Sequence, residues 1–481
     1  MRICQRSFVM GTIWQPDLAS YDGPKYLALT RSLREAIRTG DLAEGTRLPP
    51  VRDLAWRLGM TPGTVARAYQ IVTQEGLLEA AVGRGTFVAA TSPNFGASQP
   101  LLIENHGIFA RPKPGGQEVI DLRSPQLPDV GQNSAIGQIF SGLAKEGRFD
   151  YLGYPSLRRD GDLRAAYADW LFGHEPSTIS AEDIVLTQGG QNAIGLALQC
   201  CLKGPRPSVM LESLAYPGFR HAARLNRAEV VPLALDEAGM VPDALDAACR
   251  KTGARIVCLT SEAQNPTAVR MPIARRQDLI AVARRHDLQI IEDDCYSVFR
   301  SGLPSFRALA PERTWLVTSI SKSLAAGLRF GGIVCPTGQG EYARLAAQHS
   351  YFGLSRPVAD LMLALFTSGE AVRLRDDVQA VIDRRLELML NAIGAFDVSW
   401  QKGLAFVWLR LPMGWRASTF MREAESAGVL VRSADEYALS DSQAPNAVRI
   451  AIDGRSDEAS YLRGLDAMAR LLRNPPGDLP I

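Results

Sequence analysis

Lysine is rare in this chain, and one lysine stands among groups suited to covalent chemistry. The sequence has seven lysines beside 46 arginines, and Lys322 follows Ser319 and Ser321, with Arg329 seven residues further on. A Schiff base with an aldehyde needs a primary amine, which an arginine guanidinium cannot supply. The neighbouring hydroxyls and the arginine are groups that bind phosphate. The segment by itself is equally compatible with a surface lysine near the start of a helix.

Four other segments have groups that would complete such a site, and each follows a short apolar run. Gly189 and Gly190 open a helix whose free N–H groups could close on a phosphate. Tyr216 offers a ring for stacking, and the amide of Asn265 could donate to a ring hydroxyl. Asp293 ends a buried run, where a carboxylate needs a partner such as a protonated ring nitrogen. Taken singly, these signals are also typical of a turn, a core tyrosine or a solvated loop.

The order of these segments predicts that they form one site. From residue 119 onward, apolar runs alternate with helical stretches, which predicts an α/β fold with a mainly parallel sheet covered by helices. The runs cover residues 184–186, 208–211, 256–260, 289–292 and 315–319. Ligands of open α/β sheets bind beyond the carboxyl ends of the strands, so the segments that follow the runs should meet. Together they predict a site for pyridoxal 5′-phosphate (PLP).

The N-terminal part of the chain has a different pattern. Apolar residues recur at helical spacing from Tyr26 to Ile37, and Gly40 ends that helix. Thr61 can cap a later helix that has Pro62 at its first position. The whole pattern is three helices, the last two at 51–58 and 62–75, and two short strands at 77–80 and 86–88. This order predicts a winged helix-turn-helix.

The third of these helices has groups that suit DNA. It carries Arg67 and begins with hydroxyls at Thr61 and Thr64, which fits a phosphate backbone and a major groove. Arg52 opens the second helix, where it could reach a phosphate. Arg84 lies between glycines at the hairpin tip and could enter a minor groove. The alternative is a small three-helix domain used for protein contact.

The amino-acid composition limits which classes of protein this chain can belong to. The chain is 46% hydrophobic and 22% charged with a net charge of +2, which is typical of globular protein and neither demands nor excludes nucleic acid. No apolar run approaches the roughly 20 residues of a membrane span, so we expect no membrane partner. The seven cysteines form no Cys-x-x-Cys pair and the five histidines are isolated. We therefore expect a reduced, cytoplasmic protein without a metal site.

The chain is too long for one ordinary domain. We expect an N-terminal extension at 1–23, a winged helix at 24–90, a linker at 91–118 and a PLP-binding domain at 119–481. The linker is predicted from its Ser, Pro, Gly and Asn content and from its lack of periodicity.

The N-terminal pattern strongly resembles the GntR-type winged helix. The match rests on Arg47-Leu48-Pro49-Pro50-Val51-Arg52, on the Thr61 to Tyr69 segment and on Gly83-Arg84-Gly85-Thr86-Phe87-Val88. GntR-type proteins more often have serine where Pro50 stands. The resemblance implies that DNA is faced by Arg47, Arg52, Thr64, Arg67, Arg84 and Gly85.

The C-terminal pattern resembles the fold-type I PLP enzymes of the aspartate aminotransferase type, over roughly residues 119–475. The resemblance implies that Lys322 forms the internal aldimine, that Asp293 pairs with the ring nitrogen and that Tyr216 stacks on the ring. Gln191 belongs to the glycine turn and counts among the cofactor-binding residues. The resemblance also implies that the phosphate is bound by Gly189, Gly190, Ser319, Ser321 and Arg329.

The same resemblance implies three further contacts. Arg449 would clamp the α-carboxylate of a substrate, because a guanidinium fork fits a carboxylate. A tyrosine would reach the cofactor of a second subunit, with Tyr154 preferred and Tyr151 as its rival, which implies a homodimer. For the PLP phenolic oxygen, Asn265, Tyr296 and a missing contact all stay open.

A GntR-type head followed by an aminotransferase-like domain resembles the MocR subfamily of transcriptional regulators. Cys295 stands where MocR-type chains more often have tyrosine, and Ala326 replaces a usual proline. The resemblance implies a regulator that senses PLP or an amino compound through aldimine chemistry at Lys322. Two heads on one dimer should favour an operator with paired half-sites.

The competing hypothesis is a PLP-dependent aminotransferase with an appended DNA-binding domain. The predicted site is chemically complete, so residual aminotransferase activity is plausible, and whether the protein is an enzyme stays open. The DNA-binding half favours regulation, because an enzyme has no need of it.

Overall fold

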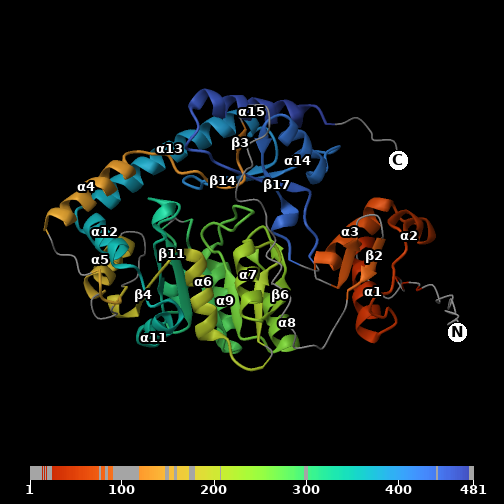
Figure 1. Ribbon diagram of the computed structural model, residues 1–481, viewed down its shortest axis with the longest axis horizontal. Coiled ribbons are helices and arrows are strands. Elements are labelled where there is room, and N and C mark those ends of the chain that lie inside the picture. Colours follow the sequence, from red (N-terminus) through yellow and green to blue (C-terminus); the bar gives the residue numbers. More distant parts are fainter. Residues whose placement is uncertain are drawn as a thin grey trace, which may run out of the picture. The chain divides into compact units, whose positions relative to one another are not determined.

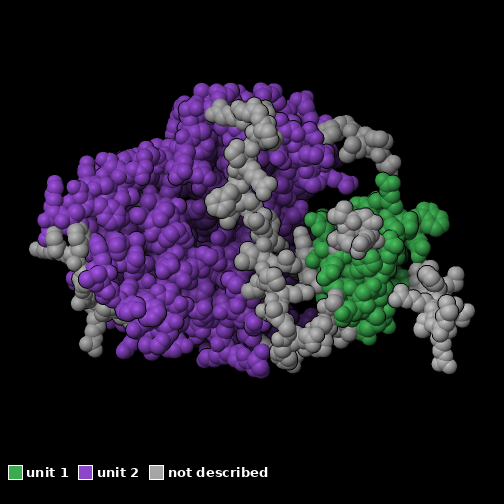
Figure 2. Space-filling view, viewed as in Figure 1, with its two compact units in different colours: residues 1–106 green, residues 107–481 purple. Residues whose placement is uncertain are grey.

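The computed structural model describes residues 24–74, 77–81, 85–89, 119–146, 151–155, 160–172, 179–205, 207–296, 302–439 and 442–475, with Trp14, Pro16 and Leu18. The chain divides into two compact units, residues 1–106 and residues 107–481 (Figure 2). The predicted linker at 91–118 lies outside the described residues, so its boundaries stay a prediction.

The first unit is the predicted winged helix-turn-helix. Its elements are α1 (Lys25–Thr39), α2 (Val51–Arg57), α3 (Pro62–Gln74), β1 (Leu78–Ala81) and β2 (Gly85–Val88). Gly40 ends α1 in the left-handed conformation, with φ of 85°. The Thr61 hydroxyl accepts a hydrogen bond from the Thr64 N–H at 3.3 Å, as a helix cap should. Apolar residues from all three helices and from the hairpin form one core around Val65.

One pairing in this unit was not predicted. Leu48 N–H donates to the Thr86 carbonyl at 2.8 Å, and Val88 N–H donates to the Thr46 carbonyl at 2.8 Å. The segment before α2 therefore lies along β2 as a third strand-like edge, with Arg47 opposite Phe87. The adjacent prolines hid this segment, because they read as a chain break rather than as a strand.

The second unit is built on a seven-stranded sheet with the order β4-β12-β11-β10-β9-β5-β6 (Figure 1). Its strands are β4 (Ile184–Thr187), β5 (Ser208–Glu212), β6 (Glu229–Leu233), β9 (Ile256–Leu259), β10 (Gln289–Asp293), β11 (Thr314–Ser319) and β12 (Gly331–Val334). The predicted mainly parallel sheet is confirmed, with β12 antiparallel to both of its neighbours. The chain returns from β11 to β12 without a crossover helix, and such a short return makes strands antiparallel.

Helices cover both faces of this sheet. One face carries α6 (Gly190–Cys201), α7 (Pro217–Leu225) and α11 (Gly340–Tyr351). The other face carries α8 (Pro242–Thr252), α9 (Ile273–Arg285) and α10 (Phe306–Leu309), with α5 (Gly161–Phe172) and α12 (Arg356–Thr367) over β4. Successive residues of β4 alternate between the faces: Val185 joins the α6 core, whereas Ile184 and Leu186 join the α5 core.

A second, smaller sheet forms the C-terminal layer (Figure 1). Its strands are β13 (Val398–Ser399), β14 (Phe406–Arg410), β16 (Arg432–Ser433) and β17 (Ala447–Ala451), and the nearby β3 (Ile120–Asp121) pairs with β15 (Val429–Leu430). The helices α13 (Glu370–Ile393), α14 (Ala417–Ser426) and α15 (Glu458–Arg473) share one apolar core with this sheet. Two further elements are α4 (Gln132–Glu146) and the hairpin of β7 (Leu235–Asp236) and β8 (Gly239–Met240). In the described part of the chain, no helix is long and apolar enough to cross a membrane.

Candidate cofactor site

The sheet topology brings the predicted segments to one edge. β5, β9, β10 and β11 run parallel, and β4 runs the same way because β12 is antiparallel to both β4 and β11. The residues that follow these strands therefore lie at the same carboxyl edge. They include Gly189, Tyr216, Asn265, Asp293 and Lys322.

Hydroxyls and a guanidinium gather beside the first turn of α6. Arg329 has the left-handed φ of 46°, and its Nη1 donates to Ser321 Oγ at 3.3 Å. Ser319 Oγ lies 3.0 Å from Ser321 Oγ. A Cβ on Gly189, which has φ of 84°, would lie only 2.6 Å from Arg329 Nη2. Only glycine lets the guanidinium approach the backbone this closely, so the group fits a phosphate at a helix N-terminus.

Asp293 lies beside the same turn. Cys295 N–H donates to Asp293 Oδ1 at 3.0 Å, and a Cβ on Gly190 would lie 2.5 Å from Cys295 Sγ. Burial raises the pKa of the Asp293 carboxyl. A cation that faced this carboxyl would favour its ionised form, so its position fits a protonated ring nitrogen.

Lys322 and two tyrosines frame the centre of the site. Lys322 is half-buried directly after β11, and its Nζ lies 5.7 Å from the centre of the Tyr296 ring. Tyr216 is half-buried at the start of α7, where its ring meets Phe219 edge-on at 6.4 Å. Burial raises the pKa of Tyr216, so its hydroxyl stays protonated. Gln191, predicted to bind the cofactor, donates from Nε2 to the Gly218 carbonyl at 3.0 Å and so supports the turn that carries Tyr216.

Arg449 enters the site from β17 of the C-terminal layer. It is 4% exposed, and its Nη1 donates to Asn265 Oδ1 at 2.9 Å. Its Nη2 donates to the Arg123 carbonyl at 2.8 Å. The buried Nε has no hydrogen-bond partner in the structure, and the guanidinium lies 5.2 Å from the Tyr437 ring centre. A buried guanidinium with one N–H to spare suits an additional acceptor such as a carboxylate.

The contact with Arg449 also orients the Asn265 amide. Its oxygen is occupied, which leaves the amide N–H groups to donate elsewhere. The partner of a PLP phenolic oxygen stays open between Asn265, Tyr296 and a missing contact.

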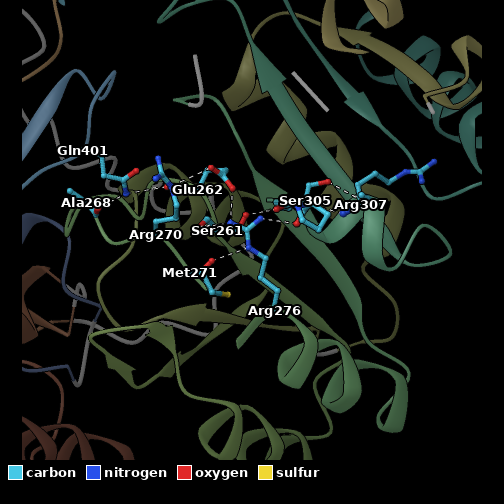
Figure 3. Close-up of polar contacts among 12 residues, drawn as sticks. Ser261, Glu262, Ala268, Arg270, Met271, Arg276, Ser305, Arg307 and Gln401 are labelled. Carbon is cyan, nitrogen blue, oxygen red and sulfur yellow. Dashed lines mark hydrogen bonds and ion pairs between the residues drawn. The ribbon is translucent and has the colours of Figure 1, made fainter. Parts of the chain in front are cut away.

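A buried ion pair holds the loop that carries Asn265 (Figure 3). Arg276 on α9 is fully buried, and its Nη2 donates to Glu262 Oε1 at 2.6 Å. The same guanidinium donates to the carbonyls of Met271 at 3.1 Å and Pro304 at 2.8 Å. Sequence reasoning missed Arg276, because an arginine in a helix is ordinarily on the surface and no local pattern marked this one.

The C-terminal layer holds the same loop from its other side (Figure 3). Gln401 Nε2 donates to the Ala268 carbonyl at 2.6 Å and to the Glu262 carbonyl at 3.2 Å. Gln401 was also missed, because a glutamine between strands gives no sequence signal of a partner so distant in the chain.

Tyr154 and Tyr151 lie on the surface of the unit. Tyr154 is 84% exposed and stacks on Phe352, with ring centres 5.4 Å apart. Tyr151 and the neighbouring Leu152 are exposed as well. Their predicted role at a second subunit stays a prediction.

The predicted DNA-facing residues lie on the first unit. The Thr61 and Thr64 hydroxyls are 2.9 Å apart at the start of α3, and Arg67 lies 4.3 Å from the centre of the Tyr26 ring. The exposed residues of the set include Arg47, Arg52, Thr61, Arg67 and Gly85, whereas Arg84 lies outside the described residues.

Gly85 pairs with Ala81 at the turn end of the hairpin and lies against Arg47. Gly85 has φ of 118°, and a Cβ there would lie 3.0 Å from Arg47 Nε. The absence of a side chain on Gly85 leaves room for the Arg47 guanidinium beside the strand.

Two family models match the chain. Residues 118–466 match aminotransferase class I and II, and residues 25–88 match the bacterial regulatory proteins of the gntR family. Among solved structures, an archaeal alanine:glyoxylate aminotransferase superposes with a TM-score of 0.66 at 24% identity, over 74% of this chain and 91% of the other. That likeness shows the fold of the second unit alone.

Three similar curated proteins are named as regulators. The uncharacterized HTH-type transcriptional regulator YdeF of Bacillus subtilis is 27% identical over 95% of this chain and 96% of its own. The HTH-type pyridoxine biosynthesis transcriptional regulator PdxR of Corynebacterium glutamicum is 30% identical over 65% and 66%. The probable rhizopine catabolism regulatory protein MocR of Rhizobium meliloti is 27% identical over 66% of both chains.

The buried ion pair of Arg276 and Glu262 leads to a prediction about the stability of the fold. Arg276→Ala should lower the free energy of unfolding by about 3–5 kcal/mol, because it removes the buried, close partner of the Glu262 carboxylate, whose ion pair with Arg270 is longer. Arg284→Ala, which breaks the exposed pair with Glu312, should cost less than about 1 kcal/mol. Urea denaturation of both variants measures the difference. Equal costs would mean that the Glu262 pair does not hold the loop.

Proposed function

We propose that this chain converts a change at its PLP site into a change in DNA binding. The chain belongs to the class I and II aminotransferase family, and it combines that domain with a gntR-family head as the MocR-type regulators do. The chain is an HTH-type transcriptional regulator, its head binds DNA, and PLP is its cofactor. A relative with this architecture is named for pyridoxine biosynthesis, which supports PLP or a related amino compound as the signal.

One observation carries the proposal. The phosphate-binding groups, the Asp293 carboxyl and the Lys322 amine lie at the same edge of the sheet. Bound there, PLP supplies an aldehyde that links covalently to a primary amine. Ser321 and Arg329 would hold the phosphate, Asp293 would face the ring nitrogen and Tyr216 would cover the ring.

Arg449 supports an effector that has both an amine and a carboxylate. Its buried guanidinium has an unfilled Nε, and its Nη1 already bonds Asn265 at the edge of the site. Arg449 would hold the carboxylate of such an effector, and Lys322 is the primary amine of the site with which the amine of the effector would compete. An effector can shift the chain toward one conformation only if it binds that conformation more tightly than the alternative.

An exposed apolar patch supports a homodimer. The patch consists of Tyr151, Leu152, Tyr154 and Phe352, and all four side chains are exposed. Large apolar side chains grouped on a surface mark contact sites. We assign this patch to a second copy of the chain, so that Tyr154 approaches the other copy's cofactor site. Two heads would then read paired half-sites in the cytoplasm, where the DNA of a bacterial cell lies.

The second candidate function is turnover as an aminotransferase. It is favoured by the presence of Lys322, Asp293 and Arg449 in one site, which is a complete set for amine chemistry. An assay that follows the conversion of an amino acid to its oxo acid separates the two functions, because a pure regulator would bind the amino acid without turnover.

Lys322→Ala should abolish the absorbance band of PLP that is covalently linked to the chain, because alanine has no amine to link to the aldehyde. Borohydride treatment followed by mass spectrometry should find a PLP-sized adduct on Lys322 in the wild-type chain alone. Lys251→Ala, at an exposed lysine on α8, is the control and should keep the band. An unchanged spectrum in the Lys322 variant would remove this lysine from the site.

Arg67→Ala should weaken binding to the DNA upstream of the protein's own gene by about tenfold and make the salt dependence shallower, because one cationic contact is lost. Fluorescence anisotropy at several salt concentrations measures both quantities. Arg422→Ala removes the same charge from α14 and should change neither. If the two variants bind alike, α3 does not read the DNA.

Leu152→Asp should raise the dissociation constant of the homodimer by about tenfold or more, since it places a charge in an apolar interface. Analytical ultracentrifugation over a concentration series measures this constant. Met413→Asp adds the same charge at another exposed apolar side chain and serves as the control. A wild-type chain that stays monomeric, or equal constants for both variants, would contradict the assignment of the patch.

A further inference from the structure

A buried carboxyl stands at the carboxyl edge of the sheet without a cationic partner. Glu212 is the last residue of β5 and is 1% exposed. Its Oε2 accepts hydrogen bonds from Thr260 Oγ1 at 3.1 Å and from Gln264 Nε2 at 3.3 Å. Its Oε1 is buried and has no hydrogen-bond partner in the structure. An ionised carboxylate with one oxygen buried and unbonded would be very costly.

Burial disfavours a negative charge on Glu212, and it outweighs the hydrogen bonds from Gln264 and Thr260, which favour that charge. Burial raises the pKa of Glu212 to about 8, and the charge of Asp293 at the end of β10 adds to this effect. Cys258 on β9 is the other titratable group that faces it within the described residues, and burial raises the pKa of that thiol well above its ordinary value. Thr260 and Gln264 are neutral, so neither supplies a compensating cation.

The hydrogen bonds of Glu212 lead to both loops of the site. Gln264 precedes Asn265, and its Nε2 also donates to the Leu214 carbonyl at 2.6 Å, two residues before Tyr216. Gln264 Oε1 accepts hydrogen bonds from the Thr267 N–H at 2.9 Å and from the Thr267 hydroxyl at 2.6 Å. The Gln264 amide thus ties the turn after β5 to the loop after β9, and Glu212 fixes its orientation.

We propose that Glu212 is a positioning residue: a neutral carboxylic acid that holds the Asn265 loop against the turn before Tyr216 and leaves to Asp293 the negative charge that faces the cofactor ring. The cofactor half of this inference rests on the proposed function, whereas the neutral, loop-holding acid does not.

The first test uses the full chain freed of PLP and measures stability against pH. Between about pH 4.5 and pH 8, Glu212 keeps its proton in the folded chain and loses it in the unfolded chain. The unfolded state then binds fewer protons, so this group makes the folded chain less stable as the pH rises. Glu212→Gln has the same shape, cannot ionise and removes this penalty.

The melting temperature of Glu212→Gln relative to wild type should therefore be higher at pH 8 than at pH 5. Glu423→Gln, which changes an exposed glutamate on α14, should show no such difference between the two pH values. A Glu212→Gln variant that is less stable than wild type at pH 8, but not at pH 5, would show a stabilising negative charge and overturn the inference. An effect equal at both pH values would overturn it as well.

The second test measures the affinity of each variant for PLP by absorbance titration. Glu212→Gln should bind within about threefold of wild type, and Glu212→Ala should bind about tenfold more weakly, since it leaves Gln264 with one buried N–H unpaired. Wild-type affinity in Glu212→Ala would refute the positioning role. If Glu212→Ala does not fold, the stability comparison with Glu212→Gln still decides the charge state. A wild-type chain that binds no PLP would refute the proposed function, but leave the stability test unaffected.

Discussion

The candidate site depends on one constraint: polar groups at the buried carboxyl edge of the sheet must be paired inside the protein, because water does not reach them. Arg276 satisfies four acceptors at once, of which Glu262 is the one carboxylate. Arg449 donates to Asn265 and to the Arg123 carbonyl. These pairs fix where each loop can lie, and the loops carry the residues that would touch the cofactor.

The same constraint separates the charges of the site. Arg329 lies beside the hydroxyls of Ser319 and Ser321, which suits the anionic end of a cofactor. Asp293 accepts a hydrogen bond from the Cys295 N–H, and burial disfavours its charge unless a cation is present. An anionic phosphate and a cationic ring nitrogen on one molecule would satisfy both ends together, which is why the residues fit PLP better than a simple anion.

The sequence could predict residues that gather at the carboxyl edge of the sheet, because glycine, lysine and strand-end carboxylates are unusual where they stand. It could also predict the alternation of strands and helices that brings those residues to one edge. It could not predict β12, since Gly331 and Gly332 weaken its strand signal. Nor could it predict Gln264 or Gln401, because an amide acquires its role only when the fold brings distant carbonyls within reach.

The loop after β9 makes polar contacts with both the seven-stranded sheet and the C-terminal layer. From the sheet side, Arg276 and Gln264 hold it, and from the C-terminal layer, Gln401 and Arg449 hold it. A carboxylate that reached the unfilled Nε of Arg449 would add a third acceptor to the guanidinium that already holds Asn265 and the Arg123 carbonyl. A small ligand at this edge therefore acts on a junction between two packed bodies. Packed bodies respond by shifting between discrete arrangements, and such a shift would carry the presence of a ligand beyond the site itself.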